Sequence, residues 1–276
     1  MQNILSVDVE EWYHPEYVRT KFMLNKPQRV TKNLDNTLDL LEEYNAFATF
    51  FVVGELAEKY PEILEKIREK GHEIAFHGYY HESLSKLNAA ILKSEMQKFG
   101  SLIKGKCLGF RAPSFSLSNK TKWALKVLED AGYKYDSSIF PSKTPLYGHR
   151  KAPLRPYKLS FEDVIKEDEN ATIWEFSLLV YALATIRIPA AGGFYLRFFP
   201  TGFISKAIEK TNKLGFPAVV FFHNWELDPE IPRLRLGVYK SFVTYYRLET
   251  MKRKLECLLS RFEFSSIEEY MSNHAL

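Results

Sequence analysis

Short apolar runs alternate along the chain with longer segments of helical spacing. The runs 48–53 (ATFFVV) and 218–222 (AVVFF) are continuously apolar, as is typical of strands buried on both faces. Between such runs, apolar residues recur every three or four positions, as at Leu34, Leu38 and Leu41, which indicates amphipathic helices. Repeated strand–helix units of this kind predict a largely parallel sheet.

The same two periods, with Gly or Pro near many segment ends, predict the individual elements. Strands are predicted at 4–8, 48–53, 73–76, 107–111, 133–136, 173–176, 218–222 and 262–265. Helices are predicted at 33–44, 61–70, 89–102, 119–131, 200–214 and 238–259. About seven units favour a closed barrel over an open doubly wound sheet, because no GxGxxG fingerprint follows the first strand. The polar, proline-rich segment 140–170 is predicted to be a long loop near one mouth of the barrel.

Composition narrows the class of protein only a little. The 276 residues are 46% hydrophobic and 26% charged, which excludes a disordered chain, a collagen-like repeat and a small disulfide scaffold. A net charge of +4, spread along the chain, gives no indication of nucleic-acid binding. Cys107 and Cys257 are far apart and fit two thiols in a reducing compartment.

No targeting segment is visible at the N-terminus, which has no basic region and reaches an acid at Asp8. The longest uncharged apolar stretch, 176–186, is too short to span a bilayer. We therefore expect a cytoplasmic protein without a transmembrane segment, and leave a peripheral contact with a membrane open.

Ionisable residues follow several of the predicted strands. They are Asp8, Glu10 and Glu11 after the first strand, His77 and His81 after the third, Arg111 after the fourth, Asp136 after the fifth and His223 after the last buried strand. In a parallel α/β barrel the carboxyl ends of the strands meet at one mouth, where catalytic groups collect. Charged groups without partners are costly to place there, so this convergence indicates function.

His77 and His81 are separated by four positions, which would put both on one face of a helical turn and within reach of one metal ion. An acid from the first strand end would complete a site of two histidines and one carboxylate with open positions. Such a site suits a catalytic zinc and also non-haem Fe(II). Arg111 has an ordinary structural alternative, but it can also fix and acidify a carboxylate such as Asp8.

In order and spacing, these residues resemble the motifs of polysaccharide deacetylases of the NodB-homology group, carbohydrate esterase family 4. The chain is most similar to the branch found with exopolysaccharide systems, which carries an extra C-terminal region. The matching segments are 6–12 (SVDVEEW), 48–54 (ATFFVVG), 77–81 (HGYYH), 111–114 (RAPS), 132–138 (GYKYDSS), 191–197 (AGGFYLR), 222–223 (FH) and 225–229 (WELDP).

The resemblance implies a deformed (β/α)7 barrel of the NodB type in a single domain, with a NodB-like core at about 1–230 and a C-terminal helical extension at about 231–276. It also implies a divalent metal, zinc first, held by three side chains, and it implies four acid–base or positioning groups. The implied ligands are Glu10, His77 and His81. Asp8 is the implied base and His223 is the implied acid. Arg111 is implied to orient the base, and Asp136 is implied to be a partner of His223. The family has two adjacent aspartates in its first motif, so Glu11 is an alternative ligand to Glu10.

The activity implied by the resemblance is hydrolysis of N-acetyl groups on the amino sugars of a polysaccharide or oligosaccharide. An N-acetylated glycan is thus the expected partner, and the oligomeric state is left open. The expected substrate contacts are Ser114, through a nearby backbone N–H, and four aromatic side chains that can stack on sugar rings or pack in the core: Tyr79, Tyr147, Tyr195 and Trp225.

Four other functions stay open on the sequence alone. The chain can be a glycan-binding relative without turnover, a hydrolase of a cyclic or non-sugar amide on the same barrel, or an Fe(II) oxygenase, although helices between the strands are unlike the usual oxygenase fold. A glycosidase using Glu175 and Glu226 is the fourth alternative, and it gives the histidine pair no role.

Overall fold

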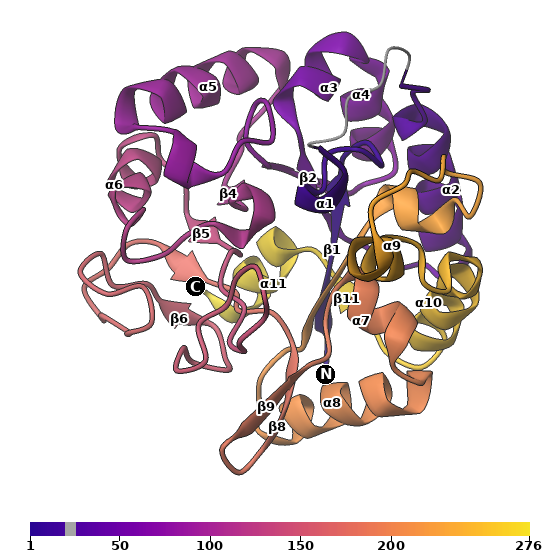
Figure 1. Ribbon diagram of the computed structural model, residues 1–276. Coiled ribbons are helices and arrows are strands. Elements are labelled where there is room, and N and C mark those ends of the chain that lie inside the picture. Colours follow the sequence, from indigo (N-terminus) through magenta and orange to yellow (C-terminus); the bar gives the residue numbers. More distant parts are fainter. Residues whose placement is uncertain (20–25) are drawn as a thin grey trace.

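The computed structural model describes residues 1–19 and 26–276. Among these residues, seven parallel strands curl into an incompletely closed barrel in the order β10–β1–β2–β3–β4–β5–β7 (Figure 1). These strands are β1 (Asn3–Val9), β2 (Thr49–Val52), β3 (Glu73–Phe76), β4 (Gly109–Phe110), β5 (Tyr135–Asp136), β7 (Trp174–Glu175) and β10 (Val219–His223). A short strand, β6 (Tyr157–Lys158), pairs antiparallel with the outer edge of β7. The deformed α/β barrel expected from the sequence is confirmed.

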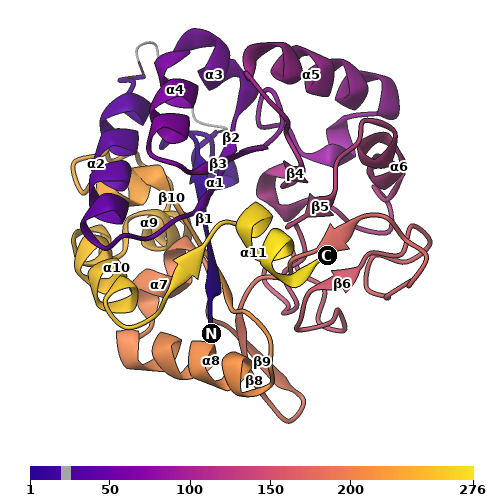
Figure 2. The same ribbon diagram turned by 180° about the vertical axis from the view of Figure 1, so that it is seen from behind.

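Helices cover the outside of the barrel (Figures 1 and 2). They are α2 (Val30–Glu43), α3 (Gly54–Lys59), α4 (Glu62–Glu69), α5 (Ala89–Leu102), α6 (Trp123–Asp130), α8 (Thr201–Lys213) and α10 (Met251–Leu259). In α2, Leu34, Leu38 and Leu41 are buried against the sheet, and each such leucine contributes roughly 1.5–3 kcal/mol through burial. All four residues of β2 are buried, because the interior and the outer helices cover both of its faces.

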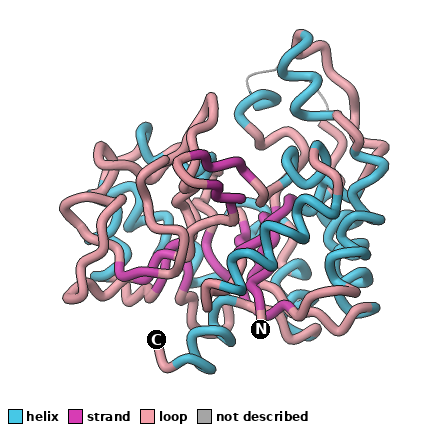
Figure 3. The backbone as a smooth tube through the Cα atoms, turned by 90° about the horizontal axis from the view of Figure 1, so that it is seen from below, coloured by secondary structure: helices cyan, strands magenta, loops and turns pink. Residues whose placement is uncertain are grey.

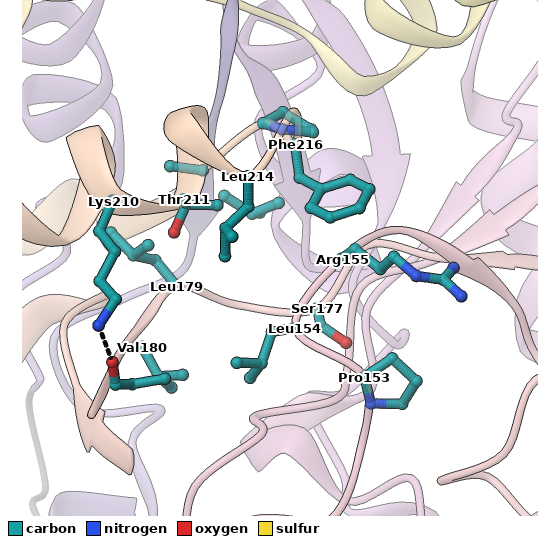
Figure 4. Close-up of a pocket in the computed structure, with 14 residues that line it drawn as sticks. Pro153, Leu154, Arg155, Ser177, Leu179, Val180, Lys210, Thr211, Leu214 and Phe216 are labelled. Atoms are coloured by element: carbon teal, nitrogen blue, oxygen red, sulfur yellow. Dashed lines mark hydrogen bonds between the residues drawn. The ribbon is translucent and has the colours of Figure 1, made fainter. Parts of the chain in front are cut away.

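The barrel closes through a seam rather than a continuous ladder. Beyond β7 the chain runs past β10, where the Leu179 N–H donates to the Val219 carbonyl at 2.9 Å. A hollow of about 220 Å³ lies at this seam, with apolar side chains such as Leu154, Leu214 and Phe216 in its lining (Figure 4). Lys210, at its edge, donates to the Ala182 carbonyl. Side chains therefore do not completely fill this seam.

The end of the barrel opposite the site is covered by the last elements of the chain. β11 (Phe264–Ser265) pairs with the start of β1, and α11 (Ile267–His274) lies across the strand ends (Figure 2). Both termini lie at this end of the molecule (Figure 3). Glu73 accepts hydrogen bonds there from the Thr49 and Tyr135 hydroxyls, each at 2.6 Å, and from the Glu268 N–H at 3.0 Å.

The predicted terminal helix 238–259 is wrong as a single helix. It divides into α9 (Val238–Tyr245), the 3-10 turn η4 (Leu248–Thr250) and α10, with Arg247 in the left-handed region at φ 49° between them. The Arg197 side chain donates to the carbonyls of Val243 and Tyr246. These two carbonyls therefore bond to a buried guanidinium where a continuing helix would use them, and the chain turns.

Other elements were not predicted. The apolar stretch 176–186 leads into a hairpin of β8 (Val180–Leu183) and β9 (Ile186–Pro189), and α1 (Glu16–Arg19), α3, α7 (Gly193–Phe198) and α11 are additional helices. Further 3-10 turns are η1 (Leu84–Lys86), η2 (Pro113–Phe115) and η3 (Asn224–Leu227). Segment 140–170 is largely irregular, as predicted, and contains β6. No helix in the described part of the chain is both long and apolar enough to cross a membrane.

Candidate active site

The carboxyl ends of the parallel strands bring the predicted ionisable residues together. Asp8 and His223 are direct neighbours in the register of β1 and β10, and His77 and Arg111 directly follow β3 and β4. Asp8, His77 and Arg111 are almost fully buried. The strand order therefore assembles groups that are far apart in sequence, as expected for a parallel barrel.

Glu10, His77 and His81 form the group that can hold a metal ion, with one ligand atom of each lying within 4.8 Å of the others. Glu10 Oε2 and His81 Nε2 are 2.9 Å apart, and Oε2 has no hydrogen-bond partner among the described residues. His77 Nδ1 lies 2.9 Å from the Arg111 carbonyl, so this nitrogen carries the proton and Nε2 keeps a lone pair for the cluster. Two imidazoles and a carboxylate with a fixed tautomer fit a divalent cation such as zinc.

The two histidines do not share a helical turn, contrary to the sequence argument. Residues 77–82 are irregular with a bend at 79–80, and Gly78 lies at φ 72° and His81 at φ 52°. A Cβ on Gly78 would lie 2.8 Å from the Pro113 ring, so a larger residue would displace the turn. The turn folds His81 back toward His77, and a left-handed histidine beside a functional cluster is the kind of backbone strain that such sites hold.

Glu10 and Glu11 point to different places. Glu11 Oε1 accepts the N–H groups of Arg29 and Val30 at 2.8 and 3.0 Å, which are donors at the start of α2. Glu10 Oε1 instead accepts the indole N–H of Trp225 at 3.0 Å. The structure thus assigns Glu11 to a helix N-terminus and leaves Glu10 in the cluster.

Charges around the cluster favour the protonation states that a metal site needs. Burial would raise the pKa of Glu10, but His81 and His223 outweigh it and hold this pKa well below its usual range. Burial lowers the pKa of His77 to about 4, although Asp8 opposes the shift. A neutral imidazole beside a carboxylate is the form that binds metal.

Asp8 is held by a buried arginine. Arg111 Nη1 donates to Asp8 Oδ1 at 2.6 Å, while Nε and Nη2 donate to the carbonyl and hydroxyl of Ser137 and to the Ser6 hydroxyl at 2.8–2.9 Å. The other carboxylate oxygen, Oδ2, faces His77 Nε2 at 3.8 Å and His223 Nε2 at 4.0 Å. One oxygen of Asp8 is therefore fixed, and the other is directed into the site.

His223 belongs to a chain of charged side chains. Its Nδ1 lies 3.0 Å from Glu226 Oε2, and Glu226 Oε1 accepts from Arg197 Nε at 2.9 Å. Burial alone would lower the pKa of His223, but the carboxylates of Glu10, Glu226 and Asp8 raise it to about 9. The imidazole is consequently protonated at neutral pH in this structure, with Nε2 toward the cluster.

The resemblance implied that Asp136 is a partner of His223, but in this structure its side chain bonds elsewhere. It ends β5 and accepts from the Ser138 N–H at 3.1 Å and the Ser138 hydroxyl at 2.6 Å. Burial and the neighbouring Asp136 raise the pKa of Glu175 well above its usual range. Glu175 is buried beside Asp136, and Glu226 is held by His223 and Arg197. Neither of these two carboxyl groups is therefore free to act in the glycosidase alternative.

A cleft of about 210 Å³ opens above the cluster, and Ser114, Tyr147, Trp225 and Tyr195, the predicted substrate contacts, are among its lining residues. Trp225 is nevertheless buried, stacks on the His223 ring at 5.4 Å and uses its N–H on Glu10. It is thus placed to hold the cluster rather than to present a sugar platform.

Tyr79 lies outside this cleft. Its buried ring packs on Gly54, where a Cβ would come within 2.4 Å, and Lys98 Nζ lies 4.2 Å from the ring centroid. The expectation that Tyr79 contacts substrate is therefore wrong in this structure, because the turn at Gly78 directs its side chain outward from the barrel interior into the α3–α5 region.

Two positioning residues were missed by sequence reasoning. Arg197 was seen only within a matching motif, and Glu226 only as a glycosidase candidate. The signal was the glycine pair at 192–193: a Cβ on Gly193 would lie 2.4 Å from the Glu226 carboxylate. Glycine there lets the start of α7 approach Glu226, with Arg197 one turn further along.

The fold and the site together define a parallel α/β barrel with a candidate histidine–carboxylate metal centre at its carboxyl mouth. Residues 25–135 match the family described as polysaccharide deacetylase, and residues 137–272 match a domain of unknown function, DUF3473. Residues 25–135 thus form a polysaccharide deacetylase domain of the NodB type, and an additional C-terminal region of the DUF3473 kind follows it.

Curated relatives share this similarity over part of their length. A peptidoglycan-N-acetylglucosamine deacetylase of Bacillus cereus is 37% identical over 92 residues, 32% of this chain and 34% of that protein. A peptidoglycan deacetylase-like protein of Gibberella zeae is 30% identical over 202 residues, 67% of this chain and 55% of that protein. The chain therefore spans between about a third and just over half of these relatives.

Solved structures confirm the fold. A candidate polysaccharide deacetylase from Mycobacterium smegmatis aligns with a TM-score of 0.55 at 19% identity, covering 98% of this chain and 88% of that one. Puue allantoinase aligns with a TM-score of 0.58 at 13% identity, covering 99% and 91%. At these identities the likeness concerns the barrel and not the substrate.

Proposed function

We propose that the protein is a metal-dependent hydrolase that removes N-acetyl groups from the amino sugars of a glycan. The observation that carries the proposal is the joint placement of Glu10, His77 and His81 with two differently held proton-transfer groups, Asp8 and His223. The match of residues 25–135 to the polysaccharide deacetylase family and the named deacetylases among the relatives support the reaction class.

Glu10, His77 and His81 would hold the divalent cation, for which zinc is the first choice. When bound, such a cation lowers the pKa of a water molecule and polarises the acetamide carbonyl. The hydrogen bond from Trp225 stops the Glu10 carboxylate from rotating, and the hydrogen bond to the Arg111 carbonyl fixes the orientation of the His77 ring. These contacts hold the ligands in place before anything binds.

Asp8 is the proposed base. Arg111 occupies Oδ1, so Oδ2 remains to take the proton from the attacking water. Ser114, at φ 54° and followed by Phe115 at φ 50°, lies at the cleft wall, and its backbone N–H is the proposed donor to the developing oxyanion. The buried Arg111 guanidinium holds the base in one orientation.

His223 is the proposed acid. Glu226 occupies Nδ1, so the proton on Nε2 is available to the leaving amine, which cannot depart as an anion. Arg197 and Glu226 act as positioning residues, because they contact His223 or its partner and not the reacting atoms. Asp136 retains a structural place beside Ser138 and Glu175 in this scheme.

An acetate-release screen tests the proposal. N-acetylglucosamine oligomers, peptidoglycan fragments and allantoin are incubated with the protein, with chelator, and after zinc, cobalt or nickel is restored. We expect metal-dependent acetate release from the N-acetylated sugars. Hydrolysis of allantoin without acetate release would instead support the cyclic-amide alternative, and metal-replete protein that binds sugar without turnover would support a binding relative.

Variants then separate the roles. Asp8→Asn and His223→Ala should each lower kcat by roughly 10²–10⁴-fold while metal content is unchanged, whereas His77→Ala should lose metal. His274 is an exposed histidine on α11, and His274→Ala is the matched control. Near-native turnover of Asp8→Asn would refute the assignment of the base.

A further inference from the structure

The cleft above the cluster is lined by segments from most of the barrel mouth. Segments that follow six of the seven parallel strands contribute to its lining, and only the β2 side contributes nothing among the described residues. The walls are 15–17 after β1, 77 and 81 after β3, 114–115 after β4, 144–147 after β5, 192–195 after β7, and 239–244 in α9 after β10. Such a ring of walls forms a well rather than a groove that runs across the mouth.

Two tyrosines join the walls on one side of this well. The Tyr17 ring on α1 meets the Tyr239 ring on α9 edge-on, with centroids 5.8 Å apart and the two hydroxyl oxygens at 3.5 Å. α1 and α9 lie beside each other at the mouth (Figure 1). A polymer crossing the cleft in this direction would have to part the two rings.

The α9 wall is fixed from beneath. Arg197, fully buried, donates to the carbonyls of Val243 and Tyr246 while it also holds Glu226. The position of this wall is therefore tied to the group that orients His223. A buried guanidinium with all these acceptors is costly to move, so the wall is a built part of the site.

The size and chemistry of the well limit what can enter it. Its volume of about 210 Å³ is below the range of about 300–1,000 Å³ that encloses drug-sized ligands. Aromatic and aliphatic side chains such as Leu146, Tyr147 and Phe242 dominate its walls. Among the described lining residues, Arg197 is the one lysine or arginine, and each of its three guanidinium nitrogens already donates to Glu226, Tyr246 or Val243. Apart from His223 and the metal-binding cluster, the described lining therefore offers no free cationic side chain to an acidic group on a sugar.

We propose that the well receives the end of a glycan: one uncharged N-acetylated sugar residue enters through the mouth, and internal residues of a polymer are excluded. This inference rests on the proposed function and adds the position within the glycan at which the reaction occurs. The Tyr17–Tyr239 pair determines this specificity by closing one side.

Binding tests the inference without turnover. Calorimetry on the zinc-loaded His223→Ala variant compares N-acetylglucosamine, its tetramer and N-acetylmuramic acid. A one-residue well predicts dissociation constants for monomer and tetramer within about threefold of each other, and binding of the muramic acid at least about tenfold weaker because its carboxylate stays unpaired. Affinity that rises tenfold or more with length, or equal affinity for the acidic sugar, would overturn the proposal.

Product analysis gives the second readout. The tetramer, labelled with ¹⁸O at its reducing end, is incubated to completion and the free amine is located by mass spectrometry. We expect one free amine, on a terminal residue, for the wild type. The double variant Tyr17→Ala/Tyr239→Ala should yield internal amines. Tyr80 is an exposed tyrosine outside the cleft, and Tyr80→Ala should keep the terminal pattern.

The outcomes separate the two hypotheses. Internal amines from the wild-type protein would refute end-on binding while confirming deacetylation. A terminal pattern unchanged in the double variant would refute the role of the tyrosine pair. Absence of both acetate release and sugar binding would refute the proposed function, and end-on binding with it.

Discussion

Trp225→Phe isolates the hydrogen bond that orients Glu10. The substitution keeps an aromatic ring against His223 and removes the indole N–H, which lies 3.0 Å from Glu10 Oε1. The carboxylate then loses the donor that fixes its rotation, although His81 still faces its other oxygen. Asp8, His77 and the backbone of the cluster are not altered, so the change falls on the geometry of a single ligand.

The expected magnitude follows from the charge of the acceptor. A hydrogen bond to a buried carboxylate contributes about 1.5–3 kcal/mol, and loss of such an outer contact typically weakens metal binding about 10–100-fold. These two ranges agree, since tenfold corresponds to about 1.4 kcal/mol. We therefore expect the zinc dissociation constant of Trp225→Phe to rise 10–100-fold.

Competition with a chromogenic chelator measures this constant, and Trp12→Phe is the matched control. Trp12 belongs to the same small hydrophobic cluster as Trp225 and loses an N–H bond of equal length, 3.0 Å, to the Pro27 carbonyl. It should lose stability without a comparable loss of zinc affinity. Unchanged affinity in Trp225→Phe, or an equal loss in both variants, would refute the reasoning.

Three further predictions concern single side chains. Burial raises the pKa of Glu73 to about 7, above its unfolded value, so its stabilising contribution falls as pH rises from about 4.5 to 7. Urea unfolding should therefore show the free energy of unfolding of Glu73→Gln rising by roughly 2 kcal/mol relative to that of the wild type between pH 5 and pH 8. A difference that stays constant over this range would contradict the prediction. Gly193→Ala should displace Glu226 and lower kcat more than zinc affinity, which steady-state kinetics with metal analysis can check. Glu10→Gln should lose zinc, whereas Glu11→Gln should retain it and unfold at lower urea; the reverse result would exchange their roles.

Much of the site could be predicted because strand ends are easy to read in this chain. Runs such as 48–53 and 218–222 indicate buried parallel strands. Where an ionisable residue directly follows such a run, as His223 follows 218–222, it must lie at the same mouth as the others. The positions of Asp8 and His223 depend only on strand order and register, which the repeating pattern determines.

The rest depends on contacts that have no local pattern. The histidine pair converges through a left-handed turn at Gly78 and His81, whereas spacing alone suggested a helix. Trp225 is of the residue type that often stacks on sugars, but it is buried, and its indole N–H donates to Glu10. The partner of His223 is Glu226, three residues further along. Glu226 is held in place by Arg197, which can approach it because Gly193 has no side chain.

The placement of β1 has a consequence for how the protein can be divided. β1 carries Asp8 and leads to Glu10, yet its neighbour β10 comes much later in the chain, and Glu10 bonds to Asn224 across 214 positions. A fragment that stopped at the junction of the two family regions, near residue 136, would leave one edge of β1 bare and open to association with other chains. During synthesis the first strand must likewise wait for nearly the whole polypeptide, which favours slow, late assembly. The two regions that sequence families treat separately thus contribute neighbouring strands to one sheet.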